Sequence, residues 1–263
     1  MDEGLHTAYD ACRRMHRRHD PTYYWATRRL PADKRPATHA LYGYVRTADE
    51  IVDGPRRPPD PSARRAALDA WEAELERPAH PIARALVHAG DRHELPLGEL
   101  HTYMGSMRID CAPVRIRTWD ELDAYMDGSA GTVGRIMAAL LEVPERHRAD
   151  FGRLGQAFQL ANFVRDVRED RDLGRVYLPV ERITDDELRA AAAAGVVRAR
   201  ALFDDCEPAV AAAPARVRPG IRMACGVYRA VLDRVEAIDF DVLRRSTAAR
   251  PWSVAGAALG ALR

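Results

Sequence analysis

Several common signals are missing from this sequence of 263 residues. Its four cysteines lie far apart and form no CxxC pair, so neither a cysteine zinc site nor a secreted disulfide framework is expected. No run of about 18 apolar residues occurs, and the N-terminus lacks the basic-then-apolar order of a signal peptide. The GxxxxGK[ST], GxGxxG and HExxH motifs are also absent, so nucleotide binding and zinc-protease chemistry have no support.

The charge is balanced, with 40 basic and 39 acidic residues and a net charge of +1. A chain without a basic excess gives no general reason to expect nucleic acid as a partner. Hydrophobic residues make up 47% and charged residues 30%, which is a globular composition. We therefore expect a soluble, cytoplasmic protein, although a greasy substrate is compatible with this composition.

The residue pattern favours helices throughout. Alternating Val, Ile and Thr runs are scarce, whereas Ala, Leu, Arg and Glu are abundant. The fold class expected is all-α, with residues 1–263 forming one domain. Ser62 is the expected cap of a helix through Leu75, and Thr118 with Glu121 forms a capping-box pattern. Helices are predicted over 5–19, 37–52, 62–75, 81–89, 97–109, 119–128, 148–171, 187–206 with a possible break at Gly195, and 219–243.

Two segments carry carboxylates at helical spacing. Asp49 and Asp53 lie four residues apart, so on a helix both project from one face, with Arg46 beside them. The second segment places Asn162, Asp166 and Asp170 in an i, i+4, i+8 row, with Gln159 near its start. Like charges at i, i+4 destabilise a helix by about 0.2–0.5 kcal/mol, so two such rows suggest a shared cationic ligand.

A hard divalent cation fits that requirement, because Mg2+ prefers carboxylate and phosphate oxygens. Four carboxylates and a diphosphate of about −3, with three Mg2+ ions, leave about −1, which Arg46 or Arg165 could offset. The pattern therefore indicates a clamp for metal and diphosphate. The alternative reading, solvated acidic helix faces, stays open on spacing alone.

At these residues the sequence resembles the squalene and phytoene synthase family, and most closely its actinobacterial phytoene synthase type. The resemblance covers most of the chain. It rests on both aspartate motifs, on the tyrosine-plus-AGxxG segment between them, and on an N-terminal stretch: 42–53, 159–170 with 174–179, 124–134, and 18–27.

The resemblance implies an all-helical isoprenoid (terpenoid) synthase bundle around one central apolar cavity. It implies Mg2+ as cofactor, held by Asp49, Asp53, Asn162, Asp166 and Asp170. Residues that would contact the substrate and its diphosphate are His19, Thr22, Arg46, Gln159, Arg165 and Tyr177. Residues that would line the reaction chamber are Tyr42, Tyr125 and Tyr228.

The implied activity is that of a Mg2+-dependent prenyltransferase that ionises an allylic isoprenyl diphosphate and releases diphosphate. Phytoene-type head-to-head condensation with a second prenyl diphosphate is the leading interpretation. One alternative transfers the prenyl group to a small aromatic acceptor, indole- or carbazole-like, in secondary metabolism. Cyclisation of one diphosphate and a non-catalytic helical binding protein are further alternatives.

The sequence departs from the family pattern in three places. The chain is short, and the loss is expected around 185–200, which would make the cavity smaller. Arg168 stands where the family usually has glycine, and faces either solvent or diphosphate. Asp127 is either a base toward an acceptor or a surface carboxylate.

Two further expectations concern surfaces. Gly128, Gly131 and Gly134 are expected to give a prenyl tail close access to a helix. The arginine-rich stretches 56–65 and 244–250 are read as solvated, with peripheral membrane contact as the alternative.

Overall fold

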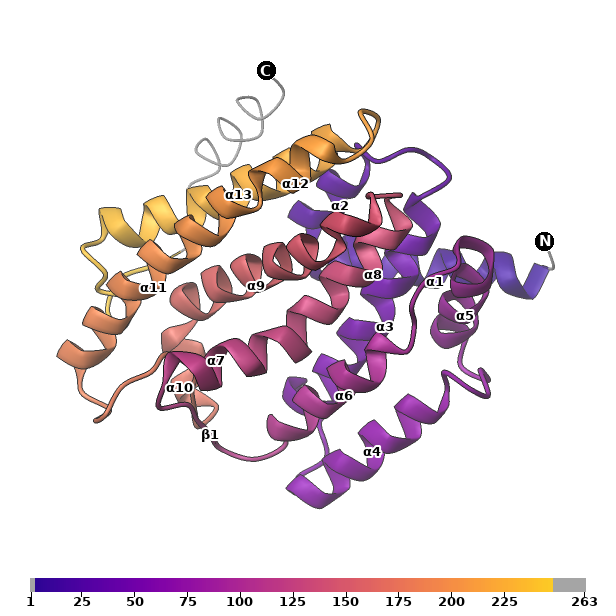
Figure 1. Cartoon of the computed structure of the whole chain (residues 1–263). Helices are drawn as coiled ribbons and strands as arrows, with labels where there is room; N and C mark the ends of the chain where they lie inside the picture. Colours follow the sequence, from indigo (N-terminus) through magenta and orange to yellow (C-terminus); the bar gives the residue numbers. More distant parts are fainter. Residues whose placement is uncertain (1–2, 248–263) are drawn as a thin grey trace.

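The computed structural model describes residues 3–247, except for the side chain of Thr22. The expected all-α class is confirmed, with helices arranged around a central helix, α9 (Figure 1). The helical elements are α1 (Glu3–His19), α2 (Pro21–Thr27), α3 (Arg35–Asp53), α4 (Pro61–Ala73), α5 (Pro81–His93), α6 (Glu99–Ile109), α7 (Trp119–Met126), the π-helical turn η1 (Asp127–Gly131), α8 (Thr132–Leu140), the 3₁₀ turn η2 (Glu145–His147), α9 (Arg148–Arg165), α10 (Val167–Asp172), α11 (Asp185–Asp205), α12 (Glu207–Ala212) and α13 (Arg218–Ala237).

Two very short strands tie distant loops together. Strand β1 (Val114–Arg115) pairs in parallel with β2 (Arg175–Val176), so that Val114 lies opposite Arg175. The pairing brings the loop after α6 against the segment that follows the second acidic motif.

The N-termini of α7 and α4 test the two helix caps predicted from the sequence. Thr118 Oγ1 accepts a hydrogen bond from the Glu121 backbone N–H at 3.2 Å, and the Glu121 carboxylate accepts one from the Arg117 N–H at 2.7 Å. The expected cap of α7 is therefore confirmed. The expected Ser62 cap is wrong, because Asp60 caps α4 by accepting from the Ala63 N–H at 2.8 Å, with Pro61 in the first turn.

The long helix predicted over 148–171 is divided at Asp166, which has φ −99° and ψ 14°. Aspartate favours helix ends over helix interiors, because its short polar side chain competes for local hydrogen bonds. The row of Asn162, Asp166 and Asp170 is therefore bent at its middle residue.

Helix α11 continues through Gly195, where a break was possible. A Cβ atom added at Gly195 would lie 2.6 Å from Val164 Cγ2 of α9, so the glycine permits close packing of these two helices. The region where the chain is expected to be shortened, around 185–200, thus lies within a continuous helix of 21 residues.

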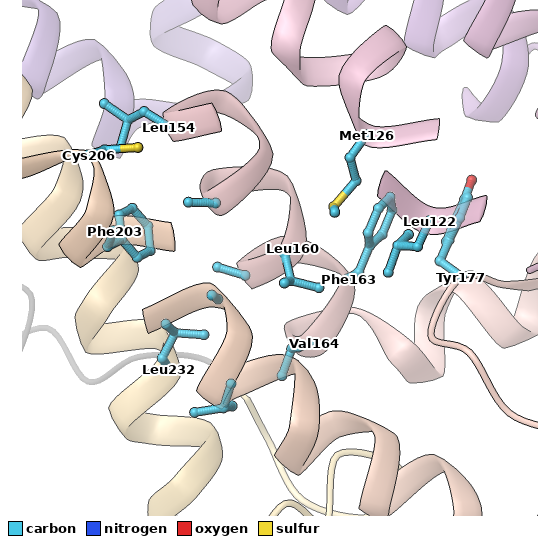
Figure 2. Close-up of a cluster of buried hydrophobic side chains, with 14 of the residues drawn as sticks. Leu122, Met126, Leu154, Leu160, Phe163, Val164, Tyr177, Phe203, Cys206 and Leu232 are labelled. Carbon is cyan, nitrogen blue, oxygen red and sulfur yellow. The ribbon is translucent and has the colours of Figure 1, made fainter. Parts of the chain in front are cut away.

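The larger hydrophobic core surrounds α9, as Figure 2 shows. Helix α9 packs against α8 on one side and against α11 and α13 on the other. Leu160 and Val164, in the C-terminal half of α9, are fully buried. Near its C-terminal end, Phe163 stacks on Tyr177 with ring centroids 4.2 Å apart. The aromatic stack fixes the end of α9 that carries the second acidic segment.

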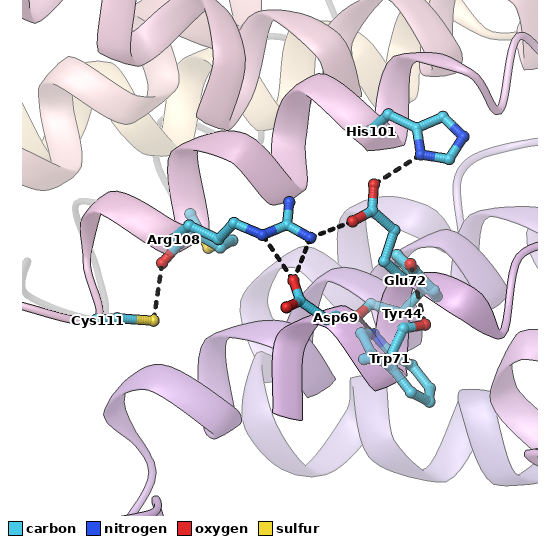
Figure 3. Close-up of polar contacts among 8 residues, drawn as sticks. Tyr44, Asp69, Trp71, Glu72, His101, Arg108 and Cys111 are labelled. Carbon is cyan, nitrogen blue, oxygen red and sulfur yellow. Dashed lines mark hydrogen bonds and ion pairs between the residues drawn. The ribbon is translucent and has the colours of Figure 1, made fainter. Parts of the chain in front are cut away.

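A second core fixes α3, which carries the first acidic segment. Trp71 of α4 donates from Nε1 to the Tyr44 carbonyl oxygen at 3.1 Å and stacks on the Tyr44 ring. Arg108 of α6 binds the Asp69 and Glu72 carboxylates of α4 (Figure 3). Because α4 is held both to α3 and to α6, the helix bearing Asp49 has a defined position.

Candidate active site

A cavity of about 300 Å³ lies between α2, α3, α8, α9 and α13. Its wall is mainly apolar, which confirms the expected central apolar cavity. The polar side chains on the wall come from α2 and its N-cap, α3, η1, α9 and α13: Asp20, Tyr23, Thr27, Tyr42, Ser129, Gln159, Asn162 and Tyr228. A volume of this size is within the range of small-molecule sites, about 300–1,000 Å³.

The first acidic segment is at the C-terminal end of α3. Asp49 accepts a hydrogen bond from the Tyr103 hydroxyl at 3.0 Å. Burial raises the pKa of the Asp49 carboxyl to about 6, although the Tyr103 hydrogen bond and Arg46 act to lower it. Asp53 is more exposed and forms an ion pair with Arg175.

The second acidic segment surrounds the junction of α9 and α10. Arg165 binds the neighbouring Asp166 carboxylate through two nitrogens, each 2.6 Å from an oxygen. Burial, followed by the charge of Asp166, raises the pKa of Asp170 to about 8. Asn162 Oδ1 is buried and has no hydrogen-bond partner among the described residues.

The two acidic segments face each other. Asp53 and Asp110 both raise the pKa of Asp170, and Arg175 lowers it. Arg175 is 5% exposed and also donates to the Asp110 carbonyl oxygen at 2.8 Å. Carboxylates from α3, from the C-cap of α6 and from α10 are therefore gathered around one guanidinium.

Sequence reasoning missed the buried residue at the centre of this region, Asp110. Its carboxylate accepts hydrogen bonds from the hydroxyls of Tyr125 and Tyr177, the latter at 2.8 Å. Burial raises the pKa of Asp110 to about 6, and both tyrosine hydrogen bonds act to lower it. Asp110 is 67 residues from Tyr177, so no local spacing pattern could have linked them.

Two basic side chains and Glu50 form a second polar cluster. Arg46 and His19 both approach Glu50, with Arg46 Nε at 3.4 Å and His19 Nδ1 at 3.5 Å from Oε1. Glu50 was not among the expected site residues. Thr22 lies in α2, but its side chain is outside the described part of the structure.

The aromatic residues expected to line the chamber divide into two groups. Tyr42 and Tyr228 line the cavity. The Tyr42 ring stacks on His16, with centroids 4.0 Å apart and planes 8° from parallel, and His16 Nδ1 lies 2.9 Å from His39 Nδ1. Tyr125 was also expected on the wall, but the structure places it behind the cavity, because its hydroxyl is bound to Asp110. Tyr177 belongs to the same buried cluster.

Asp127 and Arg168, the two positions where the sequence departs from the family pattern, are also outside the cavity wall. Asp127 pairs with Arg135 at 2.8 Å and accepts from Gln156 at 3.2 Å, which favours its reading as a paired surface carboxylate. Arg168 is exposed and lies 3.6 Å from Glu169, which favours the solvent-facing alternative.

Of the three glycines, only Gly134 lines the cavity. A Cβ there would meet the Phe151 carbonyl oxygen at 2.2 Å, and one at Gly131 would meet Asp127 Oδ1 at 2.6 Å. Gly134 thus permits close packing of α8 against α9. Because Gly128 and Gly131 do not line the cavity, the expectation that they admit a prenyl tail is wrong.

The carboxylate and amide oxygens of the two acidic segments fit a divalent cation that prefers oxygen ligands. Asn162 offers a buried amide oxygen without a partner among the described residues, and burial, with smaller contributions from neighbouring carboxylates, raises the pKa values of Asp49 and Asp170. Within residues 3–247, no three His, Cys, Asp or Glu side chains converge closely enough to hold a metal by themselves. A cation here would therefore share its coordination with substrate oxygens, as Mg2+ commonly does.

Comparisons with known proteins agree with this site. A family model described as squalene/phytoene synthase matches residues 16–253. A phytoene synthase of Arthrospira platensis is 30% identical, over 93% of this chain and 89% of its own length. A 15-cis-phytoene synthase of Synechocystis is 31% identical, over 92% of this chain and 80% of its own length.

Two solved structures share the fold. A dehydrosqualene synthase superimposes with a TM-score of 0.87 at 22% identity, covering 98% of this chain and 96% of its own. A squalene synthase from Alicyclobacillus acidocaldarius gives 0.80 at 26% identity, covering 91% and 97%.

Fold and cavity together define an all-α terpenoid synthase. The chain belongs to the squalene/phytoene synthase family, and with that family it is a prenyltransferase acting on prenyl diphosphates.

Proposed function

We propose that this protein condenses two allylic prenyl diphosphates head to head, in the manner of a phytoene synthase, and releases diphosphate. The observation that carries the proposal is the pair of facing acidic segments beside one apolar cavity. The relatives named as phytoene synthases support the same assignment, since they align over nearly the whole chain.

The metal in this proposal is Mg2+, held by Asp49 and Asp53 on α3 and by Asn162, Asp166 and Asp170 around the α9–α10 junction. Bound there, it would act as a Lewis acid on the diphosphate leaving group. Arg165, Arg46 and His19 lie beside these ligands and would bind the remaining diphosphate oxygens, with Thr22 and Gln159 as further contacts. The prenyl chain would occupy the apolar cavity, where water is excluded.

The cavity wall would then protect and stabilise the allylic cation. Tyr42 and Tyr228 present aromatic rings to the cavity, and each face is worth about 0.5–2 kcal/mol to a nearby cation. Tyr42 is held in place by its stack on His16. Tyr125 and Tyr177 contribute indirectly, because they fix Asp110 and the segment that carries Arg175.

Product analysis tests this proposal. The purified protein is incubated with Mg2+ and geranylgeranyl diphosphate alone, and the organic extract is analysed by mass spectrometry. We expect a hydrocarbon with two prenyl chains. A cyclic product would replace condensation by cyclisation, and turnover that needs an added indole or carbazole would replace it by arene transfer.

A non-catalytic role is tested by the same incubation, because it predicts no diphosphate release from any allylic substrate. A cytoplasmic location is part of the proposal. All four cysteines are free thiols, as is usual in reducing compartments.

A further inference from the structure

Helix α2 separates the cavity from the protein surface. Tyr23, Ala26 and Thr27 line the cavity from one face of this helix. The opposite face exposes Trp25, 56% accessible, together with the exposed Arg28. A single helix of seven residues thus lies between the apolar chamber and solvent.

The exposed side of α2 is continuous with an arginine-rich face of α1. Arg28 lies over the Trp25 ring at 4.8 Å, and Trp25 packs edge-on against Tyr24 with centroids 6.4 Å apart. The Tyr24 hydroxyl is in turn within hydrogen-bonding reach of Arg13. The Trp25 surface is defined by its exposed members, Arg13, Arg17, Trp25, Arg28 and Arg29.

The chemistry of this surface matches an anionic membrane. Arg17 is four residues after Arg13, so the two lie on one face of α1. Asp10 compensates one of these charges, through its 3.2 Å contact with Arg13. Exposed tryptophan and arginine side chains favour the surface of an anionic bilayer. The indole ring enters the headgroup region, and the guanidinium groups bind lipid phosphates.

We propose that the Trp25 surface docks this protein on an anionic lipid bilayer. The benefit rests on the proposed function, because a hydrocarbon product leaving the cavity past α2 would enter the bilayer directly. Within residues 3–247, no helix is long and apolar enough to cross a membrane. The proposed contact is at the bilayer surface, and it lies on α1 and α2, away from the stretch 56–65 considered from sequence.

Vesicle co-sedimentation tests the charge contribution. The full chain is mixed, without prenyl substrate, with vesicles of phosphatidylcholine or of an equimolar phosphatidylcholine–phosphatidylglycerol mixture. We expect binding to the anionic vesicles only, weakened by salt. The Arg28→Gln, Arg29→Gln variant should bind about 30-fold more weakly. The matched control combines Arg65→Gln in α4 with Arg77→Gln in the turn after α4. It removes the same charge from another surface and should bind like the parent protein.

Fluorescence quenching tests the position of Trp25. Brominated phosphatidylcholine in the anionic vesicles should quench part of the tryptophan emission, and Trp25→Ala should abolish this quenching. Trp71, which is 6% exposed, should remain unquenched.

Four results would overturn the proposal. They are no vesicle binding, equal losses in the test and control arginine variants, quenching that persists in Trp25→Ala, and a protein dimer that only the Arg28, Arg29 variant disrupts. Because no prenyl substrate is used, such a failure would leave the condensation assay unaffected.

Discussion

The buried Asp110 cluster gives the sharpest stability prediction. In Asp110→Ala, the hydroxyls of Tyr125 and Tyr177 lose their acceptor, while both tyrosines are only 6% and 5% exposed. Each buried donor left unsatisfied costs about 1–3 kcal/mol. We therefore expect the free energy of unfolding to fall by about 2–6 kcal/mol.

A double-mutant cycle identifies the cause of that loss. Tyr177→Phe alone should cost about 1.5–3 kcal/mol, because it removes one hydrogen bond to a charged group. When Tyr177→Phe is combined with Asp110→Ala, it also removes one of the two tyrosine hydroxyls that Asp110→Ala leaves without an acceptor. The double variant should therefore be more stable than the sum of the single losses predicts, by about 1–3 kcal/mol.

Urea denaturation followed by circular dichroism measures each corner of the cycle. Tyr9→Phe is the matched control, because Tyr9 pairs with His88 in the other core cluster. Its loss should add to that of Asp110→Ala within about 0.5 kcal/mol. Additivity of Asp110→Ala with Tyr177→Phe would refute the reasoning, since it would show that the two side chains do not depend on each other.

Three further predictions follow from single positions. The raised pKa of Asp170 means that the folded state binds this proton more tightly than the unfolded state, so metal-free stability should fall as pH rises from about 4 toward 8. Melting curves should show this fall, and Asp170→Asn should reduce it. Gly195→Ala should cost about 1–3 kcal/mol by clashing with Val164, whereas Gly105→Ala in α6, where nothing lies within 4 Å, should stabilise by up to about 1 kcal/mol. Asp127→Asn should keep normal turnover and product, because its partner Arg135 is outside the cavity; a changed product would restore its role as a base.

Local sequence patterns predicted the parts of the site that local geometry determines. Asp49 and Asp53 share a face of α3 because they are four residues apart on a regular helix. The capping box at Thr118 and the all-α class also follow from short-range rules. The row through Asp166 was only approximately predicted, because the helix is interrupted at that residue, where an aspartate favours a helix end over a helix interior.

Long-range contacts account for what sequence reasoning could not find. Asp110 gathers two tyrosines and Arg175 only because β1 and β2 pair across the fold. Tyr125 matches the family motif, yet its side-chain direction is set by Asp110. Gly134, expected from the sequence to leave space for a prenyl tail, is instead a close contact with Phe151 of α9, to which no local sequence pattern links it.

Release of diphosphate from geranylgeranyl diphosphate, measured against Mg2+ concentration, tests the facing-aspartate clamp most directly. The folded Asp49→Asn, Asp166→Asn variant should lose about a hundredfold or more of this activity. The control Asp172→Asn, Asp186→Asn, at two exposed positions, should retain it. Release by the Asp49, Asp166 variant at the parental rate, or release independent of Mg2+, would contradict the proposed clamp.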